Sequence, residues 1–339
     1  MKLRFKHHLI LTSLLTLGSG WVHATQVNLY TTREPALIQP LLQEFSAKTG
    51  VKVNTVFIKD GLLERVKAEG RRSPADVLLT VDFGNLVDLV EGGVTQPIQS
   101  KILNQAIPGN LRAANGHWYA LSMRARAVYA SKERAPLTAI NYEELANPKW
   151  KGKICIRSGS HVYNTSLIAA YIAHHGEKAT EQWLRGVKAN LARPASGGDR
   201  DVARDILGKI CDIGVANTYY VGRMRTGNDV EQQRWGNAIN VVLPRFSNGG
   251  THVNVSGAAV AKNAPNAKQA VQLLEFLVSD HAQAIYAQSG FEYPVKPGVK
   301  IDPVIASFGK LNIDTIRLSE IARYRKTANL LVDKVQFNH

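Results

Sequence analysis

The chain has 339 residues, of which 45% are hydrophobic and 20% are charged, and its formal net charge at pH 7 is +15. A single hydrophobic core stops growing at about 250 to 300 residues, so the length excludes a one-core domain and predicts two lobes. The positive charge does not indicate nucleic-acid binding, because Lys and Arg are interspersed with Asp and Glu and form no long basic block. The charge suits an anionic cargo better, although an ordinary solvated surface explains it equally well.

The N-terminal segment has the pattern of a secretory signal peptide. Three cations precede the apolar run Leu9–Leu17, and residues 22–24 offer a small-residue cleavage site. The run is shorter than the roughly 20 apolar residues of a membrane-spanning helix. We therefore expect residues 1–24 to be removed on export to the periplasm of a Gram-negative cell, which leaves a net charge of +12 once those three cations are subtracted. No cysteine lies near the predicted cut, which favours a free periplasmic protein over a lipid-anchored one.

The mature chain begins with an alternation of short β-rich runs and amphipathic helical stretches, which is typical of α/β domains with mostly parallel sheets. We predict a strand at 27–30, a helix over 37–45 that Gly50 ends, and a second strand at 51–58. A helix at 62–68, a strand at 75–81 and a helix at 86–90 continue this pattern.

Two extended stretches interrupt the alternation. In the first, between Trp118 and Ala130, the two-residue period of a strand places Ser122, Arg124 and Arg126 on one face. The second is 251–261. We interpret both as crossover strands between the lobes. Between them we predict helices at 166–173 and 177–191 and a strand at 213–216, and after them helices at 268–278 and 281–288.

These elements predict two α/β lobes joined by two crossover hinge strands, with a ligand cleft between the lobes. We expect residues 25–126 and 251–301 to form the first lobe. Residues 127–250 and 302–339 are then expected to form the second lobe.

The chain has two cysteines, Cys155 and Cys211. In an oxidising compartment, a pair far apart in sequence most simply forms one disulfide bond. The alternative is two buried free thiols.

None of the motifs GxSxG, HExxH, GxxxxGK[ST], CxxC and GxGxxG occurs in the mature chain. We therefore expect a protein that is not an enzyme. A secreted enzyme with an unrecognised active site stays a third hypothesis, and it predicts turnover instead of stoichiometric, saturable binding.

Three tyrosines form the most informative set of candidate ligands: Tyr163 and the pair Tyr219 and Tyr220. We expect the pair at the end of a strand, with Asn217 or Thr218 capping the helix that follows, and we expect Thr165 or Ser166 to cap a helix beginning at residue 167. A trivalent cation displaces the proton of a phenol, and phenolate oxygen is a hard donor suited to Fe(III). The alternative is that these rings are ordinary packing aromatics.

Six segments of the chain resemble the periplasmic ferric-iron-binding proteins of ABC importers. They are residues 73–82, 124–127, 163–166, 217–222, 250–257 and 292–298. They occur in the family's order and cover nearly all of the mature chain. The resemblance implies the two-lobed α/β periplasmic binding protein fold of type II. It also implies that Tyr163, Tyr219 and Tyr220 coordinate ferric iron.

The sequence departs from many members of this family near the start of the mature chain. Those members carry a histidine and a tyrosine just after an arginine, whereas residues 32–35 read Thr-Arg-Glu-Pro. The pattern resembles the subgroup in which three tyrosines bind iron together with a carbonate-type synergistic anion, and the two cysteines also match that subgroup. The resemblance then implies that Arg33 and Arg124 position the anion through their planar donors. Alternatively, Arg33 forms a surface salt bridge and Arg124 is a strand-edge cation. Glu34 is a possible additional ligand.

We conclude from the sequence that the chain captures ferric iron with carbonate or bicarbonate as synergistic anion. It is expected to act as a monomer that delivers iron to an inner-membrane ABC permease and its ATPase, with no nucleic-acid partner. The alternative is a binding protein of the same fold for a small organic or inorganic anion, with the tyrosines as stacking walls. The identity of the anion, the affinity, the tolerance of Fe(II), the role of Glu34, the state of the empty lobes, the iron source and the release trigger do not follow from the sequence.

Overall fold

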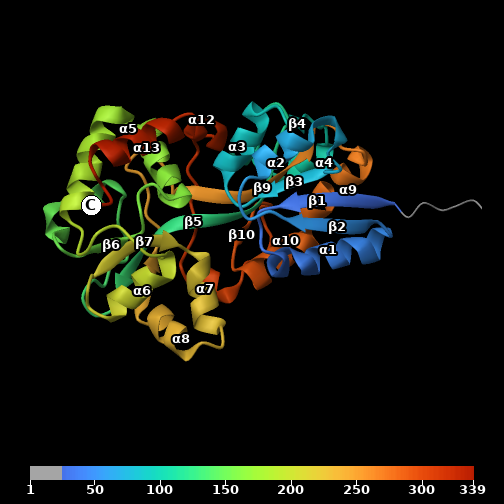
Figure 1. Cartoon of the computed structure of the whole chain (residues 1–339). Coiled ribbons are helices and arrows are strands. Elements are labelled where there is room, and N and C mark those ends of the chain that lie inside the picture. Colours follow the sequence, from blue (N-terminus) through green and yellow to red (C-terminus); the bar gives the residue numbers. More distant parts are fainter. Residues whose placement is uncertain (1–24) are drawn as a thin grey trace, which may run out of the picture.

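The computed structural model describes residues 25–339, and the predicted signal peptide, residues 1–24, lies outside the described residues. Two α/β lobes lie side by side and are joined by two long strands (Figure 1). We call the half built on β1, β2 and β3 the first lobe and the half built on β6, β7 and β8 the second lobe.

The first lobe begins with the predicted βαβ unit. Strand β1 (Gln26–Thr31) pairs in parallel with β2 (Lys52–Phe57) and β3 (Val77–Thr80). Helix α1 (Pro35–Thr49) has proline in its first turn, where the missing N–H costs nothing, and it ends at Gly50 in the left-handed conformation, as predicted. The other elements of this stretch are α2 (Leu62–Glu69), α3 (Phe83–Glu91), β4 (Thr95–Gln96), α4 (Lys101–Ala106) and the short 3₁₀ helices Gly70–Arg72 and Gly109–Leu111.

Strands β5 (Tyr119–Ser131) and β9 (Val253–Ala261) form the connection between the lobes, which confirms the two predicted crossover strands. Residues 119–125 of β5 pair with β9, whereas residues 126–131 pair with strands of the second lobe. β9 in turn pairs with β3 of the first lobe. Every residue of both strands is buried. The strand order is β2-β1-β3-β9-β5-β7-β6, so one continuous sheet runs through both lobes.

The second lobe is built on β6 (Ile154–Ile156), β7 (Ile213–Asn217) and β8 (Ile239–Val242). Its helix α5 (Val162–Ala189) joins the two helices that the sequence predicts, with a kink at Gly176, where φ is 78° and ψ is 168°. Glycine adopts this conformation without a steric cost. Its other elements are α6 (Asp199–Leu207), α7 (Tyr219–Thr226), α8 (Val230–Asn237) and the 3₁₀ helices Glu143–Ala146 and Pro148–Trp150.

After β9 the chain returns to the first lobe and then crosses back. Helices α9 (Ala267–Leu277) and α10 (Asp280–Gly290) and strand β10 (Tyr293–Pro294) pack in the first lobe. Helices α11 (Pro303–Ala306), α12 (Leu318–Ala322) and α13 (Arg325–Lys334) follow, and α12 contacts both α5 and α3. Arg325 donates to Asp88 on α3 at 2.9 Å, so the C-terminal segment bridges the two lobes.

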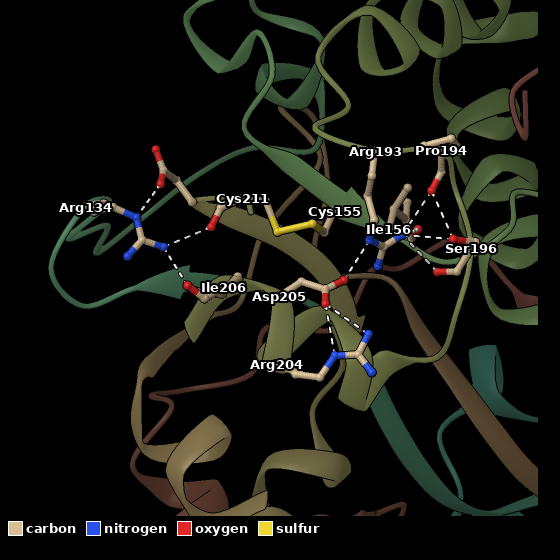
Figure 2. The surroundings of a disulfide bond; sticks show 11 residues. Arg134, Cys155, Ile156, Arg193, Pro194, Ser196, Arg204, Asp205, Ile206 and Cys211 are labelled. Carbon is tan, nitrogen blue, oxygen red and sulfur yellow. Dashed lines mark hydrogen bonds and ion pairs between the residues drawn. A yellow bond between two sulfur atoms is a disulfide. The ribbon is translucent and has the colours of Figure 1, made fainter. Parts of the chain in front are cut away.

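Cys155 and Cys211 form a disulfide bond within the second lobe, as predicted (Figure 2). Cys155 lies in β6, and Cys211 lies between α6 and β7. The Arg134 guanidinium donates to the carbonyl oxygens of Ile206 and Cys211 at 2.6 and 3.0 Å. The disulfide and Arg134 together fix the path of the chain from α6 into β7.

In residues 25–339, no helix combines the length and the apolar character that crossing a membrane requires.

Candidate functional site

A cavity of about 300 Å³ lies between the lobes. It is lined from the first lobe and the crossover strands by Thr32, Arg33, Glu34, Leu37, Val81, Arg124, Ser256 and Glu292, and from the second lobe by Tyr163, Arg200, Tyr219, Tyr220 and Arg223. The structure therefore brings all six candidate residues named from the sequence, three tyrosines, two arginines and Glu34, to a single cavity.

Tyr219 and Tyr220 are the first two residues of α7, immediately after β7, as predicted. Their rings stack with centroids 4.1 Å apart. Thr218, one of the two predicted cap residues, is the N-cap residue of α7, but its side chain makes no capping hydrogen bond. Its hydroxyl instead accepts the Ala125 N–H at 3.3 Å, and Asn217 accepts from Arg126. Both side chains are used to tie α7 to the crossover strand β5.

Tyr163 lies in the first turn of α5, which begins at Val162 instead of residue 167. The prediction that Thr165 or Ser166 caps this helix is therefore wrong. The cap is His161, whose Nδ1 accepts the Tyr163 N–H at 3.3 Å. Burial and the nearby Arg157 lower the pKa of His161 to about 4, so its imidazole is neutral at pH 7. The His161 ring also meets the Tyr163 ring edge-on, which holds the phenol in place.

Guanidinium groups lie over all three phenol rings. Around Tyr163, the guanidiniums of Arg157, Arg124 and Arg126 lie 5.2, 5.7 and 6.0 Å from the ring centroid. This distance range is that of cation–π contacts. Asp199 pairs with two of these guanidiniums, those of Arg126 and Arg157, and so neutralises part of the positive charge around the Tyr163 ring.

The paired tyrosines have one guanidinium each. Arg223 lies over Tyr219 at 5.1 Å, and Arg200 lies over Tyr220 at 5.3 Å. The sequence reasoning did not single out either arginine. Arg223 could have been predicted from the sequence, because it follows Tyr219 by four residues and therefore shares its helix face. Arg200 had no such signal, since it reaches the site from a different helix.

Burial and the neighbouring phenols raise the pKa values of two of the tyrosines. The pKa of Tyr219 lies well above 10, and that of Tyr220 is raised to about 12. The main cause is desolvation, which disfavours the phenolate, and the nearby Tyr163 acts in the same direction. Both phenols are therefore protonated at pH 7, and a cation that binds them has to displace their protons.

Arg33 and Arg124 line the cavity from the first lobe and from β5, and both are almost fully buried, each with a relative exposure of 2%. The Nη1 groups of both donate to the Ser256 hydroxyl at 3.0 Å. Within residues 25–339, Nε and Nη2 of both arginines have no hydrogen-bond partner. Because unsatisfied buried donors are costly, these N–H groups suit an anion that can accept from both arginines at once.

Glu292 is a buried carboxylate that was not singled out from the sequence, although it begins the resembling segment 292–298. It accepts from Arg33 Nη1 at 3.1 Å and from the Ser122 hydroxyl. Burial alone would raise its pKa, but the charges of Arg33 and Arg124 and these hydrogen bonds hold the pKa below its ordinary value. Glu292 is thus ionised and restrains the guanidinium of Arg33. The partners are 259 residues apart in sequence, so no local pattern could have revealed the pair.

Glu34 and Arg126, two other residues named from the sequence, differ from Arg33 and Arg124 in exposure and in hydrogen bonding. Glu34 is exposed at the rim of the cavity, just before Pro35. Arg126 is fully paired: it donates to Asp199 at 2.6 Å, to Asn164 at 2.6 Å and to Asn217 at 3.1 Å. Arg126 therefore has a structural role beneath Tyr163.

A second cavity of about 660 Å³ lies beside α2 and α3 and shares Thr32 with the first. It contains no tyrosine and no buried guanidinium. Among residues 25–339, no group of three or more His, Cys, Asp or Glu side chains is arranged to hold a metal ion. In the described part of the chain, the phenols of the smaller cavity are thus the best candidate ligands for a hard cation.

A polar cavity between two α/β lobes that are joined by two crossover strands defines a solute-binding protein. A family model described as bacterial extracellular solute-binding protein matches residues 72–306. The chain is 43% identical to iron uptake protein A1 of Synechocystis over 298 residues, which are 87% of this chain and 83% of that protein. The chain belongs to the bacterial extracellular solute-binding protein family.

Solved structures show the same similarity. The Bordetella ferric binding protein is 64% identical with a TM-score of 0.89, over 93% of this chain and 100% of that chain. A Trichodesmium protein, solved in complex with iron and citrate ligands, is 42% identical with a TM-score of 0.89, over 92% and 99% of the two chains. These similarities confirm the predicted family and fold.

Proposed function

We propose that this protein captures ferric iron in the periplasm and delivers it to an ABC importer. Tyr163, Tyr219 and Tyr220 supply phenolate ligands, and Arg33 and Arg124 hold a synergistic anion. The observation that carries the proposal is the meeting of three phenols with two buried arginines, each with unpaired donors, at one cavity. The relatives named for iron uptake and ferric binding support it.

The charges at the site suit this cargo. Three phenolates neutralise one Fe(III) ion, and coordination positions that the phenolates leave free can be filled by an anion. The free Nε and Nη2 groups of Arg33 and Arg124 provide donors for that anion. Since Tyr219 and Tyr220 are protonated at neutral pH, iron binding releases protons, and a lower pH favours iron release.

Carbonate or bicarbonate is the proposed anion, and citrate is the competitor, because the Trichodesmium relative was solved with iron and citrate. Glu34, at the cavity rim, is a possible additional ligand. The mechanism is binding and delivery without bond-making chemistry, by a monomer that docks on an inner-membrane permease with its ATPase.

We also propose the lobe boundaries that the sequence suggests, with residues 25–126 and 251–301 in the first lobe and 127–250 and 302–339 in the second. Iron would first bind the tyrosines of the second lobe. Rotation about the crossover strands would then bring Arg33 to the anion.

The test is to add ferric citrate to the iron-free protein with and without bicarbonate and to record the visible spectrum. Ferric phenolate absorbs visible light, so the wild type should become coloured. Tyr163→Phe, Tyr219→Phe and Tyr220→Phe should each weaken or shift this band. Tyr171→Phe is the matched control, because Tyr171 is on the same helix as Tyr163 but stacks on Trp183 away from the cavity.

A wild type that stays colourless, or three variants that keep the full band, would rule out the iron assignment. A colourless protein that binds bicarbonate or citrate stoichiometrically would instead support the alternative, a binding protein for a small anion. The donors of Arg33 and Arg124 that have no partner in residues 25–339 are compatible with that alternative, because they suit a small anion.

A further inference from the structure

The turn between α10 and β10 contains a strained residue beside the candidate site. Phe291 has φ 54° and ψ 32°, in the left-handed region that residues with a side chain rarely adopt. A non-glycine residue keeps such a conformation only where its surroundings hold it. For Phe291 the ring contacts identify these surroundings.

The ring of Phe291 lies directly on the backbone of α7 at Gly222. A methyl group at position 222 would lie 2.3 Å from Cγ and 2.4 Å from Cδ1 of Phe291, which is far closer than atoms can approach. Gly222 comes two residues after Tyr220, on the helix that begins with the tyrosine pair. Only glycine therefore lets the ring approach this helix so closely.

The neighbours of Phe291 contact the other half of the site. Glu292 accepts from the Arg33 guanidinium, and a methyl group at Gly290 would lie 3.6 Å from Arg33 Nη2. α10 packs on α1, α9 and β5, whereas α7 packs on α6 and α8. The three residues 290–292 thus link the tyrosine helix of the second lobe to an arginine of the first lobe.

We propose that Phe291 is a positioning residue for cargo binding. Its ring rests on Gly222 when the lobes close, and this contact aligns the phenols of α7 with the guanidinium that Glu292 restrains. The inference rests on the proposed function, because it assumes that the cargo is held between these phenols and these arginines. No contact of Phe291 with the cargo is required.

The alternative is that Phe291 only fills space, and a double-mutant cycle separates the two cases. In Gly222→Ala, the added methyl group collides with the ring and keeps α7 away from its aligned position. In Phe291→Gly, the contact is lost without a collision; glycine is needed at position 291 because Cβ of Phe291 would itself lie 2.7 Å from a methyl group at position 222. In the double variant Gly222→Ala/Phe291→Gly all colliding atoms of residue 291 are gone, so the methyl group at position 222 should have no further effect. Phe57→Ala, which removes an exposed ring on β2, is the control for loss of an aromatic side chain.

Two quantities are measured on the intact mature protein. The first is its affinity for ferric iron, from the visible band in competition with citrate. The second is its radius of gyration before and after iron loading. Gly222→Ala should weaken affinity by about 10-fold to 100-fold, as loss of a group that orients a ligand does. The double variant should bind within about threefold of Phe291→Gly, which is the error of an additive cycle. Phe291→Gly should keep the band and contract less on loading than the wild type.

A Gly222→Ala variant that binds like the wild type would overturn the proposal, because alanine is the better helix former and only the collision predicts a loss. A double variant whose loss equals the product of the two single losses would overturn it as well. If Gly222→Ala does not fold, as judged by circular dichroism, the contraction of Phe291→Gly decides, and a wild-type contraction overturns the proposal.

A colourless wild type refutes the iron assignment separately. The same cycle is then measured by calorimetry with citrate as the probe, and the same comparison between the single and double variants decides the role of Phe291.

Discussion

Arg124 and Arg126 show how much the surroundings determine the role of a residue. They are two positions apart on β5 and both lie close to Tyr163, yet their partners differ. Arg126 is neutralised by Asp199, whereas Arg124 donates to the Ser256 hydroxyl and, among the residues that the structure describes, has no partner for Nε and Nη2. The sequence could predict that both arginines face the same way. It could not predict which is paired, because Asp199 is 73 residues away.

Replacing Arg124 with methionine should therefore change the response of iron binding to bicarbonate, whereas replacing Arg126 with methionine should lower the stability. Arg124→Met should bind iron with little response to added bicarbonate, and its free energy of unfolding should stay close to that of the wild type. Arg126→Met should lose about 3 kcal/mol of stability, because it deprives the buried Asp199 of its closest cation. Urea unfolding and iron titration at two bicarbonate concentrations measure both effects. A full bicarbonate response in Arg124→Met would contradict the anion role.

His252, just before β9, should make stability depend on pH. It is buried, its Nε2 lies 2.5 Å from the Ser166 hydroxyl, and burial lowers its pKa to about 4. The unfolded chain takes up a proton near pH 6.5, but the folded chain does so only near pH 4. The stability from the neutral ring is thus fully present above pH 6.5 and is lost as the pH falls toward 4. Between pH 7 and pH 5 the loss should be about 2 kcal/mol.

The measurement is urea unfolding of wild type and His252→Gln at pH 7 and pH 5. Since glutamine does not titrate, the variant should lose about 2 kcal/mol less than the wild type over this interval. An equal loss in both proteins would assign the acid sensitivity to other groups.

At the level of elements, the disulfide bond stabilises the part of the second lobe that carries half of the candidate site. The Cys155–Cys211 bond closes a loop with a sequence separation of 56 residues, which contains Tyr163 and Arg200. The chain-entropy model gives a stabilisation of about 4 kcal/mol for a loop of this length. The double variant Cys155→Ser/Cys211→Ser should therefore have a free energy of unfolding about 4 kcal/mol lower than that of the wild type, as measured by urea unfolding. Added reductant should lower the stability of the wild type only. Equal stability of the two proteins would contradict this prediction.

The sequence predicted which strands and helices form more accurately than it predicted the residues at which they begin and end. The long alternating runs predicted β5 and β9, because a buried strand of this length leaves few other interpretations. The start of α5 was predicted five residues too late, because Thr165 and Ser166 look like capping residues. In the structure, Thr165 bonds to Asn329 and Ser166 to His252, which are distant in sequence. The predicted caps failed because these polar side chains serve tertiary contacts.

The candidate site followed from the sequence only in part. The three tyrosines were singled out from the residue pattern, and the resemblance then implied their role as iron ligands and the anion role of Arg33 and Arg124. The sequence did not identify Glu292, which lies in one of the resembling segments, as the partner of Arg33, or Phe291 as the contact of α7. Those pairings depend on how the lobes meet, and a linear pattern does not contain that information.

For the whole molecule, the C-terminal segment should influence how the lobes move. Arg325 on α13 reaches across to Asp88 on α3 and lies against Gly84 of the same helix. Asp88 is 42% exposed, so this pair should contribute at most about 1 kcal/mol to stability. Asp88→Asn and Arg325→Met should nevertheless shift the radius of gyration of the iron-free protein by the same amount, because each removes the same bridge. The double variant should shift it no further.

Small-angle X-ray scattering of the four proteins tests this expectation. Unequal shifts in the two single variants, or a double variant that shifts by their sum, would show that the two residues act independently. No shift in any variant would show that the bridge does not restrain the lobes.

The course of β5 has a consequence for signalling. Successive residues of a strand are about 3.3 Å apart along its axis, so Arg124 and Arg126, which serve different lobes, are separated by only about 7 Å. In the proposed mechanism the cargo would therefore sit close to the rotation axis, where displacements are smallest, while atoms at the outer ends of both lobes would travel much farther through the same angle. A single ion would in this way change the spacing of distant surface regions, and a transporter that contacts both ends would distinguish a loaded molecule from an empty one without touching the metal.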